Sequence, residues 1–375
     1  MRWTPRMNDQ FSQQIELVVR DLLGVYAQAE TNLVRGVALA VRAGVDSEGQ
    51  LVDMQTQLIR MRKLARQAVR SLNAVSPALI EKLIEDASQF GLLYALGQLE
   101  SVPVPFDITR DVPNAPAALA LRADMYSRMA QVHERILRLP DDVYRAVIAD
   151  ATSGKLILGG TSRRAEQAAW QKLLSTGVTG FVDSAGRNWN LASYVEMATR
   201  TASIRAYHQQ AEYTMQANGV QLVTIVVGND SCPECGPWAG KVCAISGDTG
   251  PRSVLNPLTG QLQTVNVEYT LDEARAHGWS HPNCRCSEAA YMPGLDPVVN
   301  LNKYDPELEA ERTQLRAMER KVRSIKRDVM TSSDSSLSYH KRRLREAQAE
   351  IRQHVSQTGL MRKSYREQPN LGYRR

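Results

Sequence analysis

The sequence predicts a mainly helical protein with a small central α+β domain that is stapled by a zinc-type Cys/His site and followed by a basic helical C-terminal tail. Three observations lead to this prediction. Apolar residues recur at spacings of three and four along both ends of the chain, which is the pattern of helices with one buried face. All five cysteines lie between Cys232 and Cys286, and the excess positive charge lies beyond Lys303.

Composition and charge place the chain among ordinary globular proteins. Of 375 residues, 43% are hydrophobic and 23% are charged, which allows two or three domains with a real core. The net charge is +6, and Lys303–Arg375 carries 18 Lys/Arg against 10 Asp/Glu, or +8, which leaves −2 for the remainder. No apolar run approaches the roughly 18–20 residues of a membrane-spanning helix. We therefore expect no membrane partner.

Clustered cysteines indicate a metal or redox role rather than a disulfide framework. Their number is odd, and the first residues lack the apolar run and cleavage site of a signal peptide. Disulfide frameworks belong to exported chains. We therefore expect an intracellular origin.

Residues 1–150 are predicted to form a helical N-terminal domain. Ser76-Pro77 is typical of a helix start, because a capping hydroxyl precedes a proline in the first turn. Pro140 is predicted to end a later helix, because proline lacks the donor that a helix interior needs. The expected helices cover about residues 11–26, 51–68, 77–99 and 117–139, with a proline-rich connector at 102–116.

Residues 151–300 are predicted to form the α+β domain. The apolar run Val220–Val227 is typical of a buried strand, and it leads directly into Cys232. Thr270 is the expected N-cap of a short helix, and residues 248–262 are expected to form a loop. Further elements are expected as a helix at 162–174, short strands near 181 and 189 with a turn at 184–186, a helix at 191–218, and a strand after Val242.

Residues 301–375 are predicted to form a basic helical hairpin or coiled-coil-like tail. From Pro306, apolar residues alternate at spacings of seven, three and four, as in a short coiled-coil seam. A serine-rich break at 331–338 separates this helix from a second, basic helix that ends near Thr358-Gly359.

The cysteines and one histidine form two half-sites with metal-ligand spacing. Cys232 and Cys235 are a C-x2-C pair, and His281 with Cys284 supplies the second pair, with Cys286 as the alternative fourth ligand. Zinc prefers four such donors in a tetrahedron, so we predict a structural zinc ion. Redox or disulfide pairing and a catalytic metal are the alternatives. Cys243 has apolar neighbours and is expected to be a buried thiol.

A catalytic zinc needs an open coordination position and a nearby general base. Only Glu234 lies close in sequence, and the chain contains no H-x-E motif beside the cysteines. The sequence therefore predicts a protein that is not an enzyme.

Five separated motifs resemble, in the same order, the minor capsid protein 2 family of tailed bacteriophages. They cover roughly residues 150 to 367, and the half-sites more distantly resemble the head-morphogenesis proteins typified by phage Mu protein F. The motifs are Gly180-Phe181 to Trp189, Tyr194 to Thr201, Cys232 to Gly247, His281 to Arg285, and Glu311 to Leu360 with its basic helices. Many relatives have histidine where this chain has Cys286, which leaves the fourth ligand open.

The resemblance implies a structural virion protein in the capsid interior or at the portal vertex, made in the host cytoplasm during assembly. Several copies per virion would bind the portal protein, the major capsid protein or both, with the N-terminal helices as one candidate contact. The protein would assist head assembly and the packaging or delivery of DNA. The alternatives are a zinc-dependent nuclease or toxin-like effector carried in the head, and a nonspecific DNA-binding protein.

The basic tail is the expected contact with packaged double-stranded DNA. Clustered cations neutralise phosphates and release counterions without reading sequence. A solvated or portal-binding helix is the alternative. The candidate residues are Lys341, Arg342, Arg343, Arg345, Arg374 and Arg375.

Overall fold

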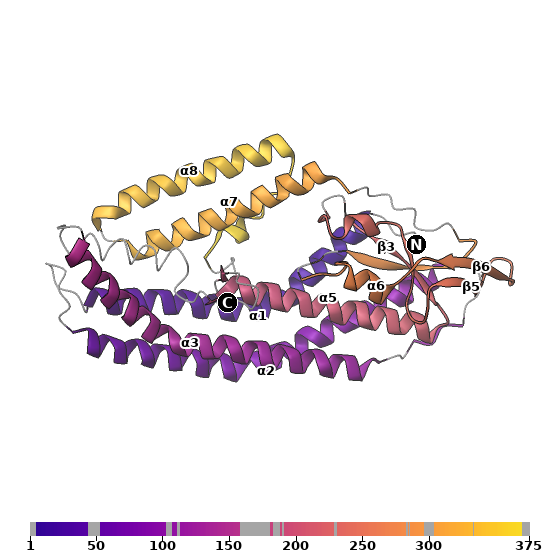
Figure 1. Cartoon of the computed structure of the whole chain (residues 1–375), viewed down its shortest axis with the longest axis horizontal. Coiled ribbons are helices and arrows are strands. Elements are labelled where there is room, and N and C mark those ends of the chain that lie inside the picture. The colour runs from indigo at the N-terminus through magenta and orange to yellow at the C-terminus, as the bar shows by residue number, and fades with distance from the viewer. Residues whose placement is uncertain are drawn as a thin grey trace. The chain divides into compact units, whose positions relative to one another are not determined.

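A computed structural model describes residues 5–43, 53–102, 107–110, 113–157, 181–182, 188–189, 191–228, 231–282, 284, 286–295, 304–332 and 334–369. It confirms a mainly helical chain with a small sheet region (Figure 1). The helices are α1 (Pro5–Ala43), α2 (Met54–Glu100), α3 (Ala115–Ile157), α5 (Leu191–Ala217), α6 (Leu271–Ala276), α7 (Pro306–Thr331) and α8 (Asp334–Thr358), with 3-10 turns η1 (Gly236–Trp238) and η2 (Ser364–Glu367). The strands are β1 (Phe181–Val182), β2 (Asn188–Trp189), β3 (Leu222–Val226), β4 (Val242–Ala244), β5 (Gly250–Leu255), β6 (Leu262–Val267), β7 (Tyr269–Thr270) and β8 (Ser287–Tyr291).

Two compact units divide the chain, and each is assembled from three separate segments. The first unit contains Met1–Arg20, Ile80–Met125 and Met197–Arg312. The second contains Asp21–Leu79, Tyr126–Glu196 and Thr313–Arg375. The three-domain division at 150 and 300 stays a prediction.

The first unit is built around strand β3. All five residues of β3 are buried, as the apolar run predicted, and the strand pairs antiparallel with β4 on one side and β8 on the other. Strand β7 adds to β4 in parallel, so the order is β7-β4-β3-β8. Helices α2 and α5 and both cysteine segments pack on this sheet in one apolar core. Its buried members include Ala95, Leu99, Ala211, Met215, Val223, Ile225 and Trp279.

The structure confirms one local prediction in the first unit, a helix cap, and contradicts another, a loop. Thr270 caps α6 as predicted, because its hydroxyl accepts from the Glu273 N–H at 3.1 Å and the Glu273 carboxylate accepts from the Thr270 N–H at 2.7 Å. The prediction of a loop at 248–262 is wrong, since most of these residues belong to the antiparallel β5–β6 hairpin. The turn residues are concentrated at 256–261, where Gly260 has φ +69°, and the residues on either side alternate as strands do.

The second unit packs long helices against one another. Tyr26 of α1 and His133 of α3 are both buried and share a 2.8 Å hydrogen bond between the hydroxyl and Nε2. Helices α7 and α8 form a hairpin whose core contains Leu315, Val322 and Ile351. Met318 and Ile325 of the predicted apolar seam pack in the same core, and the coiled-coil-like tail stays a prediction.

Two predicted helix boundaries are wrong, because Pro77 lies inside α2 and Pro140 lies inside α3. An interior proline loses one hydrogen bond and costs about 3 kcal/mol. Buried apolar residues on both sides, such as Leu72 and Ile80 around Pro77, offset this cost when the helix continues. The expected helix at 162–174 and the turn at 184–186 lie outside the described residues.

A glycine comparison on α2 tests the packing of the first unit. A Cβ on Gly91 would lie 2.2 Å from the carbonyl oxygen of Tyr207 in α5, whereas a Cβ on Gly97 meets no atom within 4 Å. Gly91→Ala should therefore lower the free energy of unfolding by about 1–3 kcal/mol. Gly97→Ala, the matched control, should leave it unchanged or raise it by up to about 1 kcal/mol. Denaturant titration measures both, and equal stability of the two variants would contradict this packing.

Candidate metal centre

Strand register brings the two cysteine half-sites together. In the antiparallel β3–β8 pair, Val226 at the end of β3 lies opposite Ser287 at the start of β8. The chain leaves β3 toward Cys232, and it enters β8 from Cys284 and Cys286. Residues about fifty positions apart therefore meet at one end of the sheet.

The first half-site is a tight turn that continues into η1. The Cys235 and Gly236 N–H groups both donate to the carbonyl of Cys232, at 3.2 and 2.9 Å. The Cβ position of Gly236 would lie 2.6 Å from the ring of Tyr304, so this turn accepts no side chain there. The turn places Cys232 half-buried and Cys235 fully buried.

The structure brings all predicted donors together. The sulfur of Cys232 lies 2.8 Å from Nε2 of His281, and the sulfurs of Cys235 and Cys284 lie 3.4 Å apart. The donor atoms of Cys232, Cys235 and His281 lie within 4.8 Å of one another, and so do those of Cys235, Cys284 and Cys286. Tetrahedral zinc with bonds of about 2.3 Å to sulfur would hold sulfurs roughly 3.8 Å apart. The two groups share Cys235, so the five residues form one cluster of donors of the kind that zinc prefers.

His281 is oriented for binding through Nε2. Its Nδ1 lies 2.8 Å from the carbonyl oxygen of Pro282, which can only accept, so Nδ1 carries the proton. In the neutral ring, Nε2 is then the nitrogen free to bind a metal, and it lies on the side of Cys232. Hydrogen bonds of this kind on the second ring nitrogen are typical of metal-binding histidines.

The cluster offers five donors, because Cys284 and Cys286 both lie near Cys235, whereas a structural zinc ion takes four. The backbone N–H of Cys286 donates to the sulfur of Cys284 at 3.3 Å. Such a bond stabilises a thiolate, which favours Cys284 as the ligand and leaves Cys286 as the spare thiol. Both side chains are buried, so neither is selected by exposure.

The thiols cannot all ionise unless a cation lies between them. The hydrogen bond from Cys235 and the one from His281 lower the pKa of Cys232 to about 4. The neighbouring thiols Cys232, Cys284 and Cys286 raise the pKa of Cys235 far above its usual range. Hydrogen bonding to Cys232 raises the pKa of His281 to about 9. This crowding is what a metal ion relieves.

Cys243 is separate from this site, as expected. It lies on β4, is fully buried, and belongs to the apolar core. Burial raises its pKa to about 12, so it is inert as a nucleophile.

The DNA-contact candidates differ in accessibility. Lys341, Arg342 and Arg345 are exposed on α8, whereas Arg343 is half-buried. The guanidinium groups of Arg342 and Arg343 both lie over the Tyr339 ring, at 5.7 and 5.6 Å from its centroid. Arg374 and Arg375 lie outside the described residues.

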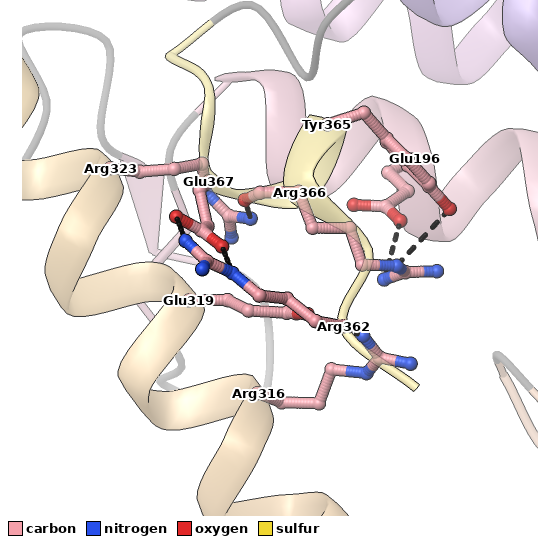
Figure 2. Close-up of polar contacts among 8 residues, drawn as sticks. All are labelled: Glu196, Arg316, Glu319, Arg323, Arg362, Tyr365, Arg366 and Glu367. Atoms are coloured by element: carbon pink, nitrogen blue, oxygen red, sulfur yellow. Dashed lines mark hydrogen bonds and ion pairs between the residues drawn. The ribbon is translucent and has the colours of Figure 1, made fainter. Parts of the chain in front are cut away.

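Sequence reasoning missed a buried ionic network at the end of the second unit (Figure 2). Arg362 donates to both oxygens of Glu367, at 2.5 and 2.8 Å, and Glu367 is only 2% exposed. Arg323 of α7 donates to the carbonyl of Arg366 at 2.5 Å, and Arg366 contacts Glu196 of α5 at 3.5 Å. These contacts fasten the segment after α8 to α7 and to the start of α5. Local charge patterning does not separate such buried arginines from exposed ones.

A comparison with protein families identifies the class of protein. A model described as phage minor capsid protein 2 matches residues 11–356, which include both cysteine half-sites and most of α8. The chain therefore belongs to the phage minor capsid protein 2 family. Searches of curated proteins and of solved structures find no match. Within the described residues, no helix has the length and apolarity needed to cross a membrane.

Proposed function

We propose that this chain is a structural protein of the phage head, placed in several copies inside the capsid or at the portal vertex. It assists head assembly and the packaging or delivery of DNA, and it binds the portal protein, the major capsid protein or both. The family match over residues 11–356 is the observation that carries this proposal.

The Cys/His cluster serves this role as a structural zinc site. Cys232, Cys235, His281 and Cys284 are its ligands, and they join the turn after β3 to the loop before β8. Four protein donors leave zinc no open position for a substrate, which favours a staple over the nuclease or effector alternative. Structural zinc contributes on the order of 10 kcal/mol in small peptides.

The basic hairpin supplies the contact with DNA. Residues 313–369 carry 14 Lys/Arg against 6 Asp/Glu, or +8. Part of that charge is buried in the network of Figure 2, so only the exposed cations, which include Lys341, Arg342 and Arg345 of α8, are available to phosphates. Contacts of this kind are sequence-independent and weaken with salt.

The decisive experiment locates the chain in purified virions. Quantitative mass spectrometry should find it at a fixed copy number, and a particle map should place it inside the head or at the portal vertex. A chain that is absent from mature and immature heads, or that degrades DNA with multiple turnovers when supplied with divalent metal, would overturn the proposal.

Metal content tests the proposed structural zinc site. Thiolate-bound zinc should be present at one equivalent per chain, and substitution with Co²⁺ should give thiolate-to-cobalt charge-transfer absorption. Cys232→Ser should lose this absorption and cooperative unfolding, because three donors close the site poorly. Cys243→Ala, which changes a buried thiol outside the cluster, should keep both. Wild-type chain that folds with no thiolate-bound metal would refute the zinc assignment.

Salt-dependent DNA binding tests the exposed face of α8. Replacing Lys341, Arg342 and Arg345 together by alanine should weaken binding equally for all sequences. The slope of log K against log salt should become shallower by roughly 0.9 for each phosphate that the variant no longer neutralises.

The matched control removes the same charge from α2, where Lys63, Arg66 and Arg70 are also exposed. This control should bind DNA as the wild type does. If both triple variants lose the same affinity, net charge rather than the α8 face governs binding.

A further inference from the structure

A second cluster of metal-binding side chains lies in the first unit, apart from the cysteines. His208 and Glu212 are four residues apart on α5 and so share one face of the helix. Glu288 comes from β8, where it pairs with Ile225 of the central strand. The cluster thus joins two elements that meet only through the fold.

The three side chains are buried and close together. His208 is 2% exposed, Glu212 8% and Glu288 0%, and their donor atoms lie within 4.8 Å of one another. Buried carboxylates are costly unless charge and hydrogen bonds compensate them. The groups around Glu212 and Glu288 must therefore supply compensating charge or hydrogen bonds.

Neighbouring groups compensate only part of the charge. Arg275 of α6 forms an ion pair with Glu212 and also contacts the exposed Asp272. The hydroxyl of Tyr94 on α2 donates at 2.5 Å to the backbone carbonyl of Glu288. With a neutral His208, two buried carboxylates face one guanidinium, which leaves one negative charge.

His208 and Glu288 are in direct contact. Nδ1 of His208 lies against one carboxylate oxygen of Glu288. Among the described residues, however, neither carboxylate oxygen of Glu288 accepts a hydrogen bond of ordinary geometry. A buried polar group of this kind calls for an ion or water as its explanation.

We propose that His208, Glu212 and Glu288 bind a divalent first-row transition cation, separate from the thiolate-bound zinc. One imidazole with carboxylates is a donor set for zinc, manganese or iron rather than for calcium, which takes only oxygen ligands. Both oxygens of Glu288 would bring the donor atoms to four. Because the ligands are buried, the ion would act structurally by tying α5 to β8.

Two buried carboxylates whose oxygens lie within 4.8 Å of each other repel one another, and a divalent ion between them would remove that repulsion. The competing occupant is a proton on His208, which would balance the same charge and exclude the metal.

Metal stoichiometry of the full-length chain distinguishes the two occupants. Equilibrium dialysis against Co²⁺ or Zn²⁺, followed by elemental analysis, should give an equivalent that adds no thiolate charge-transfer absorption. His208→Gln and Glu288→Gln should each lose that equivalent and keep the thiolate-bound one. His277→Gln is the control, because His277 is exposed and its Nδ1 contacts the carbonyl of Glu273 in the same helix.

Nitrogen NMR of wild-type chain labelled in its histidines gives a readout that does not depend on the variants folding. Metal binding predicts a neutral His208 ring with one nitrogen metal-bound and one protonated. A His208 ring protonated on both nitrogens at neutral pH overturns the proposal, as does wild-type metal content equal to that of folded His208→Gln. Because the thiolate absorption reports the Cys/His cluster separately, failure of either site is recognised on its own.

Discussion

The antiparallel pairing of β3 with β8 is the constraint on which the first unit depends. With Val226 opposite Ser287, the segments that carry the cysteines must meet at one end of the sheet. The same register fixes Glu288 beside Ile225, facing the helix that carries His208 and Glu212. Slipping the register by one residue would turn each β8 side chain to the opposite face of the sheet. One strand pair therefore positions both groups of candidate ligands.

The chain uses its basic residues in two physically different ways. On α8 the cations are exposed and remain hydrated, so they are available to an anionic polymer. In the segment after α8, Arg362 and Arg366 are held against Glu367 and Glu196, and their role is to close the second unit. Net charge alone would predict DNA contacts for both sets of cations. Exposure separates them, and it leaves the cations of the segment after α8 out of the proposed nucleic-acid contact.

Sequence reasoning succeeded where the signal is local. The run at 220–227 predicts a strand because every residue in it is apolar or β-branched apart from one glutamine, and Thr270 predicts a cap because its hydroxyl precedes a turn that contains Asp272 and Glu273. It failed at Pro77, where packing of a long helix outweighs a proline. It also failed at the ionic network, whose partners lie up to 170 positions apart. The choice of Cys284 over Cys286 as the proposed ligand rests on the direction of a backbone N–H, which residue spacing does not encode.

The interleaved construction of the two units has a consequence for synthesis on the ribosome. Each unit combines a segment from the first 80 residues with a segment that extends past residue 300. Apolar helix faces near the N-terminus can therefore be buried only after most of the chain has been synthesised. This delay leaves apolar surface exposed to aggregation, and folding is slow because contacts between residues far apart in sequence form late. Neither unit can therefore be completed before nearly the whole chain has left the ribosome.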